Sequence, residues 1–130
     1  MQDLSQALIN AIEKFFNKRW LKHFPDPNID TSSIDKRLLI ENAKTIDAII
    51  FKLLNAESEE EIASILHQSS ETELALLKMR IHWVLNYLKT HKQALQVTIY
   101  QLYNVVFLQN FLKTLLIDTF HTSYDDFLLP

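Results

Sequence analysis

The chain of 130 residues contains no glycine. Tight β-hairpin turns and many helix ends use backbone conformations that glycine adopts at the least cost. Phosphate-binding loops and the dinucleotide-binding fingerprint also need glycine, so both are excluded. A sheet of many strands joined by short turns is therefore disfavoured. The absence of glycine predicts an all-α fold.

Length and composition fit a single helical domain. Of the 130 residues, 48% are hydrophobic and 22% are charged, which is ordinary for a globular protein with a sizeable core. No repeat, low-complexity segment or linker divides the chain, so we expect one domain over residues 1–130. The absence of cysteine excludes disulfide frameworks, zinc–thiolate sites and thiol nucleophiles. The N-terminus lacks the features of a signal peptide, which predicts a cytoplasmic protein.

A stretch of twenty residues, 93–112, carries no charge. Its aromatic residues recur at helical spacing: Tyr100, Tyr103, Phe107 and Phe111. A helix that is apolar on all sides is usually surrounded by other elements. We therefore predict that residues 93–120 form the central helix of a bundle of four to five helices, with the tail 122–130 packed back on it. Six Gln and Asn side chains in this stretch would need partners in lipid, which argues against a membrane span.

Residue pairs of the capping-box type predict where the helices begin. These pairs are Asp3 with Gln6, Ser32 with Asp35, Ser58 with Glu61, Ser70 with Glu73, and Thr90 with Gln93. The first helix is expected to end near His23, before two prolines. The last pair predicts a turn between a helix over 71–91 and the helix over 93–120, and one continuous helix is the alternative. Residues at 3-4-3-4 spacing in helix 71–91 predict a packed, coiled-coil-like seam: Leu74, Leu77, Ile81, Val84, Leu88 and His91.

The segment 61–72 resembles the first helix and the turn of helix-turn-helix DNA-binding domains, through Glu61-Ile62-Ala63 and the Ser and Thr residues after the turn. This resemblance implies a transcriptional regulator that would read DNA with residues 61–80. The segment departs from the family pattern because His67 stands where the turn usually holds glycine. Residues 71–76 also offer no Arg, Asn or Gln to base edges, and nearby carboxylates would repel a polyanion. DNA binding is therefore the alternative hypothesis.

No catalytic or metal-binding motif is complete in the sequence. None of the five histidines lies in an H-E-x-x-H motif. Asp118 and His121 form the only carboxylate-x-x-His pair, whereas dinuclear metal bundles need such a pair on two helices. We therefore expect no catalytic residue, no metal ligand and no cofactor. An enzyme that uses His82 or His121 is a third hypothesis.

Residues 57–73 carry six glutamates and no Lys or Arg: Glu57, Glu59, Glu60, Glu61, Glu71 and Glu73. This acidic segment would either dock a basic partner protein or simply place carboxylates at helix starts, where the helix dipole favours them. The leading hypothesis is a non-enzymatic protein–protein interaction module, such as a small inhibitor, an immunity protein, an adaptor or a small subunit of a larger complex. Abundant apolar helix area would also support a homo-oligomer.

Overall fold

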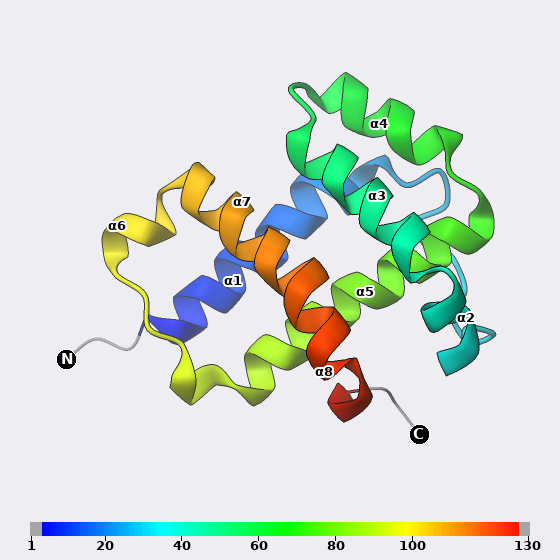
Figure 1. Cartoon of the computed structure of the whole chain (residues 1–130). Helices are drawn as coiled ribbons and strands as arrows, with labels where there is room; N and C mark the ends of the chain where they lie inside the picture. The colour runs from blue at the N-terminus through cyan, green and yellow to red at the C-terminus, as the bar shows by residue number, and fades with distance from the viewer. Residues whose placement is uncertain (1–3, 128–130) are drawn as a thin grey trace.

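The computed structural model of the chain describes the backbone of residues 4–127 and the side chains of residues 4–123. This part of the chain consists of helices joined by loops and contains no strand, which confirms the predicted all-α bundle (Figure 1). None of its residues has a positive φ angle. Ala56 and Ser69, which each follow a helix, adopt an extended backbone instead. The described helices therefore end without the left-handed conformation for which glycine is preferred.

The first half of the chain forms two long helical rods. Helix α1 (Ser5–Phe15) continues through a π-helical turn, η1 (Phe16–Trp20), and a 3-10 turn, η2 (Leu21–His23). The rod ends before Pro25, as predicted. A loop then leads to α2 (Lys36–Glu41) and α3 (Ala43–Asn55), which meet at Asn42.

The second half contains α4 (Glu59–Gln68), α5 (Glu71–Thr90), the 3-10 turn η3 (Lys92–Ala94) and the short helix α6 (Ile99–Leu102). Helix α7 (Val105–Lys113) continues through the π-helical turn η4 (Thr114–Thr119) into α8 (Phe120–Phe127). Helix α8 contacts α5, so residues 122–127 of the predicted tail lie in a helix beside the bundle. The side chains of residues 124–127 and all of residues 128–130 lie outside the described residues.

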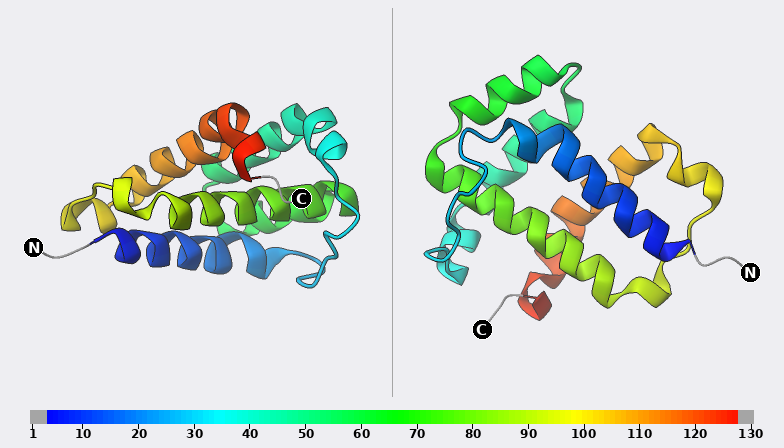
Figure 2. Two further views of the ribbon diagram at one scale, coloured as in Figure 1. Left: turned by 90° about the horizontal axis from the view of Figure 1, so that it is seen from below. Right: turned by 180° about the vertical axis from the view of Figure 1, so that it is seen from behind.

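The central helix of the bundle is α5, and the prediction that residues 93–120 hold this place was wrong. Helix α5 contacts α1, α3, η4 and α8, and Figure 2 shows it between α1 and the helices of the C-terminal half. Its buried residues include the five apolar residues of the predicted seam, whereas His91, the last seam residue, is only half-buried. The buried residues of α5 are Leu74, Ala75, Leu76, Leu77, Arg80, Ile81, Trp83, Val84 and Leu88. Residues 93–120 are instead broken into η3, α6, α7, η4 and α8. Tyr100 and Tyr103, predicted to be interior, are 85% and 83% exposed.

Two polar residues explain why the uncharged stretch does not form one rod. The side chain of Thr98 accepts a hydrogen bond from the Gln101 backbone N–H, and Asn104 accepts one from Phe107. Both residues are therefore helix N-caps, with extended backbone that ends any preceding helix. The buried side chains of this stretch follow Asn104, as in Leu112, Leu115 and Leu116, whereas apolar side chains before Asn104, such as Leu95 and Leu102, are only partly buried against the core.

The predicted caps of α4 and α5 are confirmed. The hydroxyl of Ser58 accepts a hydrogen bond from the Glu61 N–H at 3.1 Å. The hydroxyl of Ser70 accepts one from the Glu73 N–H at 3.1 Å, and the Ser70 N–H donates to the Glu73 carboxylate at 2.7 Å. These bonds satisfy backbone donors that have no partner within the helix.

Two other predicted caps were wrong, and a third cannot be located. Asp35, not Ser32, is the N-cap before α2, because its carboxylate accepts the Leu38 N–H at 2.9 Å. Thr90 lies inside α5, where its hydroxyl donates to the backbone oxygen of Asn86 at 2.9 Å. The predicted turn after α5 is present, but it forms through η3. Asp3 lies outside the described residues.

Candidate functional site

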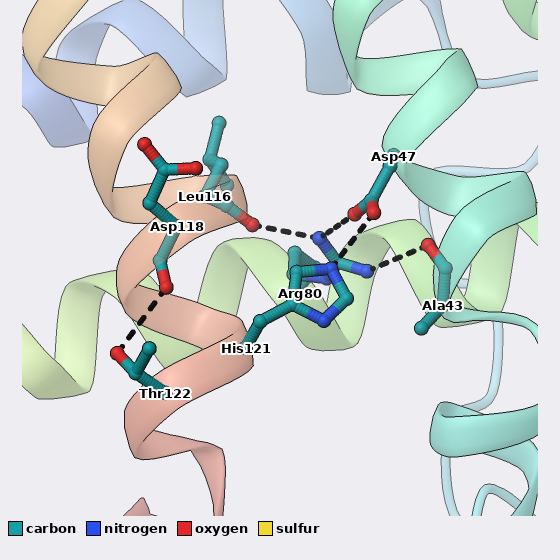
Figure 3. A network of polar contacts seen from close by, with 7 residues as sticks. All are labelled: Ala43, Asp47, Arg80, Leu116, Asp118, His121 and Thr122. Atoms are coloured by element: carbon teal, nitrogen blue, oxygen red, sulfur yellow. Dashed lines mark hydrogen bonds and ion pairs between the residues drawn. The ribbon is translucent and has the colours of Figure 1, made fainter.

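Arg80, at the middle of α5, is a charged residue buried in the core and only 1% exposed. Its Nη1 donates to Asp47 Oδ1 and to the backbone oxygen of Leu116, both at 2.7 Å (Figure 3). Its Nη2 donates to the backbone oxygen of Ala43 at 3.2 Å, and its guanidinium carbon lies 3.9 Å from the centroid of the Phe120 ring. A buried cation needs such partners to offset its loss of hydration. Arg80 thus links α3 and α5 to η4 and α8.

Asp47 on α3 bridges Arg80 and His121. Its Oδ1 binds Arg80, and its Oδ2 lies 2.7 Å from His121 Nε2. Burial lowers the pKa of Arg80, while the carboxylate of Asp47 acts in the opposite direction. No Ser or Thr hydroxyl is bonded to His121 in the described part of the chain. Asp47 therefore orients the imidazole of His121, but the described residues place no hydroxyl nucleophile beside that imidazole.

One acceptor of Arg80 comes from the π-helical turn η4, which contains Leu116. Such turns are rare, and they frequently mark functional sites because the wider turn changes where side chains and carbonyls point. In this protein η4 presents the Leu116 carbonyl to Arg80, while the Leu116 side chain is fully buried. The turn is thus part of the polar network.

A cleft of about 440 Å³ lies beside this network, between the junction of α2 with α3 and the start of α8. Its lining residues are Leu39, Ile40, Glu41, Ala43, Lys44, Phe120 and His121. A cleft of this volume is within the range of small-molecule sites. The sequence singled out His121, but it offered no sign that His121 would meet Asp47, which lies 74 residues away.

The predicted pair Asp118 and His121 is not arranged to hold a metal ion together. Figure 3 shows the carboxylate of Asp118 pointing away from His121, whose ring is turned towards Asp47. The backbone oxygen of Asp118 accepts a hydrogen bond from the Thr122 hydroxyl at 3.2 Å. Among the described side chains, residues 4–123, no group of three or more His, Asp or Glu residues is placed to hold a metal ion.

The structure divides the acidic segment into two groups. Glu57, Glu59, Glu60 and Glu61 lie at the start of α4, and Glu71 and Glu73 lie at the start of α5. Helix α4 has ten residues, so it separates the two groups by about 15 Å. The six glutamates therefore do not form one cluster.

Three of these glutamates have local structural roles. Glu59 lies 2.7 Å from Lys22 Nζ, whose hydrogen bond and charge lower the pKa of the Glu59 carboxyl. The carboxylate of Glu61 accepts the Glu57 N–H at 2.9 Å, and that of Glu73 caps α5. The other three glutamates are Glu57, Glu60 and Glu71. Their side chains are exposed, and none of the described residues is a polar partner for these carboxylates.

The helix-turn-helix resemblance corresponds to α4, the turn Ser69–Ser70 and α5. In DNA-binding proteins of this kind the second helix lies free on the surface and enters the major groove. Here the second helix is the central helix of the bundle, and Leu74, Ala75 and Leu76 are buried. This packing counts against DNA reading by residues 61–80.

A group of exposed apolar side chains lies on α6 and the start of α7, at the end of the molecule opposite α2 (Figures 1 and 2). We name it the α6 patch; it consists of Ile99, Tyr100, Tyr103, Val105 and Val106, which are 48% to 85% exposed. Among the described residues, seven large apolar side chains are exposed, and five of them belong to this patch. Sequence reasoning placed its tyrosines in the core. The capping residues Thr98 and Asn104 were the signal that could have revealed it.

No protein-family model, curated protein or solved structure matches this chain. Within residues 4–127, no helix combines the length and the apolar character that a membrane span requires. Function therefore has to be inferred from the surfaces of this chain.

Proposed function

We propose that this chain is a non-enzymatic protein–protein interaction module, in the class of small inhibitors, immunity proteins, adaptors and small subunits of larger complexes. The observation that carries this proposal is the α6 patch, with five exposed apolar side chains within eight consecutive residues. Apolar residues scattered singly over a surface are ordinary, but a contiguous group marks an interaction site. The α6 patch is such a group.

The composition of the α6 patch suits a protein partner. Tyr100 and Tyr103 each offer a ring and a hydroxyl, and tyrosine is enriched at the energetic centres of protein interfaces. Residues 93–112 carry no charge, so covering them removes no ion from water. The expected partner presents an apolar face with hydrogen-bond acceptors for the tyrosine hydroxyls.

The exposed carboxylates of Glu57, Glu60 and Glu71 would act on the rate of association. The described part of the chain neutralises none of the three, so they would attract a partner with basic residues. These carboxylates lie away from the α6 patch, because the 20 residues of α5 span about 30 Å between Glu71 and the turn before α6. They would therefore steer the encounter at low ionic strength, whereas the aromatic side chains of the patch would hold the complex together. The acidic segment would therefore assist binding, and the α6 patch would provide most of the affinity.

The test is recovery of the tagged full-length chain from its native host, followed by measurement of the affinity for the protein that co-purifies. The double variant Tyr100→Ser, Tyr103→Ser should raise Kd at least about 100-fold, because central tyrosines commonly contribute about 2 kcal/mol each. The matched control is Phe51→Ser, an aromatic residue that is 49% exposed on α3. An unchanged Kd for the double variant, or an equal loss for the control, would contradict the proposal.

The role of the acidic segment is tested separately with the triple variant Glu57→Lys, Glu60→Lys, Glu71→Lys. Its association rate with the same partner should fall, and its rate should depend less steeply on salt. Thermal unfolding serves as the control: these three side chains have no polar partner among the described residues, so only the modest loss from placing lysines at helix starts is expected. Unchanged association rates would remove these carboxylates from the interaction.

A further inference from the structure

We propose that the cleft between the α2–α3 junction and α8 binds a small amphipathic carboxylate, a molecule with one carboxylate group on a short apolar body. Its volume of about 440 Å³ is sufficient for such a ligand. The junction of α2 with α3, which lines the cleft, lies at the other end of the molecule from α6 (Figures 1 and 2). The inference is thus independent of the proposed interaction function.

The apolar side of the cleft consists of Leu39, Ile40, Ala43 and Phe120. Leu39 and Phe120 are almost fully buried, so they provide a fixed apolar floor. Ile40 is 50% exposed. It is one of two large apolar side chains of the described residues that are exposed outside the α6 patch. An apolar ligand body would cover Ile40 and remove its surface from water.

The charges at the cleft favour an anion. Lys44 is exposed on α3, and no ion-pair partner for its ammonium lies among the described residues. Glu41, the one carboxylate among the described residues that line the cleft, already pairs with Arg37 at 3.8 Å. The cation without a partner can therefore bind a ligand carboxylate, while a cationic ligand would compete with Arg37 and be repelled by Lys44.

The remaining wall of the cleft is the imidazole of His121, which is held from behind. Asp47 fixes its Nε2 at 2.7 Å, and Arg80 fixes Asp47 at the same distance (Figure 3). Arg80 itself is fixed by the backbone oxygens of Leu116 and Ala43. A wall that is already ordered loses little conformational entropy when a ligand binds, which favours binding. The buried network therefore acts as a positioning support for the cleft.

The experiment titrates the full-length protein with octanoate, octanol and octylamine, followed by calorimetry and by NMR shifts of Ile40 and His121. Octanoate should bind saturably with one site per chain and move both signals. Octylamine, which has the same apolar body and the opposite charge, should bind at least about tenfold more weakly. Absence of saturable octanoate binding, or equal affinity for the three ligands, would overturn the proposal.

Variants locate the site. Lys44→Met keeps the apolar stem of the side chain and should weaken octanoate about fivefold while leaving octanol unchanged. Lys52→Met is the matched control, because Lys52 is also exposed on α3 but does not line the cleft. Ile40→Glu should abolish binding of octanoate and octanol alike. An equal loss of octanoate affinity in Lys44→Met and Lys52→Met would mean non-specific charge attraction and would refute the site.

Discussion

Among single residues, Arg80 has the most consequential environment. Its guanidinium is fully inside the bundle, yet it has one carboxylate, two backbone carbonyls and one aromatic ring as partners. A buried ion pair contributes little net stability compared with a well-packed apolar pair, but removing one partner leaves an uncompensated charge. The stability of the fold should therefore be very sensitive to Asp47.

Replacing Asp47 with alanine should lower the free energy of unfolding by about 3–5 kcal/mol, because it leaves the Arg80 cation buried without its counter-ion. Urea denaturation measures this change. The control is Asp118→Ala, an exposed carboxylate on the adjacent turn η4, which should change stability by no more than about 0.5 kcal/mol. A loss below about 1 kcal/mol for Asp47→Ala would show that the ion pair does not stabilise the core.

His82 on α5 should make stability depend on pH. His82 lies exposed on α5, but the partial loss of its hydration against the bundle, followed by the nearby charge of Lys78, lowers the pKa of His82 below its ordinary value of 6.5. The unfolded chain therefore binds a proton at this position more readily than the folded chain. The stability that neutral His82 contributes to the folded state is thus fully present above pH 6.5, and it is lost as the pH falls through the lowered pKa.

The variant His82→Gln removes this titration. Between pH 7.5 and pH 5.5 its free energy of unfolding, measured by urea denaturation, should fall less than that of the original chain. The same fall in both proteins would mean that His82 does not contribute to the pH dependence.

Among the helices, side-chain caps mark where α2, α4, α5, α6 and α7 begin in a chain without glycine, whereas α1 and α3 begin without one. Ser58, Ser70, Thr98 and Asn104 each accept a backbone N–H three residues ahead. Two of these caps lie inside the uncharged stretch, and they divide it into separate short helices. Local polar chemistry therefore outweighed the apolar pattern that favoured one continuous rod.

The cap of α5 should be the most valuable of these, because α5 is the central helix. Ser70→Ala removes the hydroxyl that accepts the Glu73 N–H, while the backbone N–H of residue 70 can still donate to the Glu73 carboxylate, so stability should fall by about 1 kcal/mol. Ser32→Ala should change stability by no more than about 0.5 kcal/mol, because Asp35 caps α2 instead. Urea denaturation of the two variants decides the matter: equal losses would contradict the assignment of caps.

At the scale of the whole molecule, stability should be lowest at the end that carries the α6 patch. Helix α5 is surrounded by α1, α3, η4 and α8, whereas residues 95–104 form short, largely exposed turns. Amide protection follows burial and tertiary contacts, since exposed segments open locally without global unfolding. The two regions should therefore differ in hydrogen exchange.

Hydrogen–deuterium exchange tests this arrangement directly. Amides of residues 77–88 in α5 should exchange among the slowest in the protein, and amides of residues 95–104 should exchange among the fastest. Helix α4, which is amphipathic and has one exposed face, should fall between them. Equal protection of 77–88 and 95–104 would restore the uncharged stretch as the central helix.

The sequence by itself determined the fold class, the end of the first rod, the caps of α4 and α5, and the buried seam of α5. These features depend on residues a few positions apart, so local composition and spacing are sufficient to predict them. The same reasoning placed Tyr100 and Tyr103 inside the core. The spacing of apolar residues shows which helix faces are suitable for burial. It does not show which of these faces the folded chain buries, because the chain has several such faces.

Only the tertiary structure decided which helix became central and which side chains met. The three oxygens that bind Arg80 come from residues 33 to 37 positions away, and Asp47 and His121 are 74 positions apart. Such contacts depend on how the rods pack together, and that packing is a property of the whole chain. The α6 patch is exposed for a related reason. Helix α5 occupies the centre of the bundle, so residues 99–106 lie at its surface.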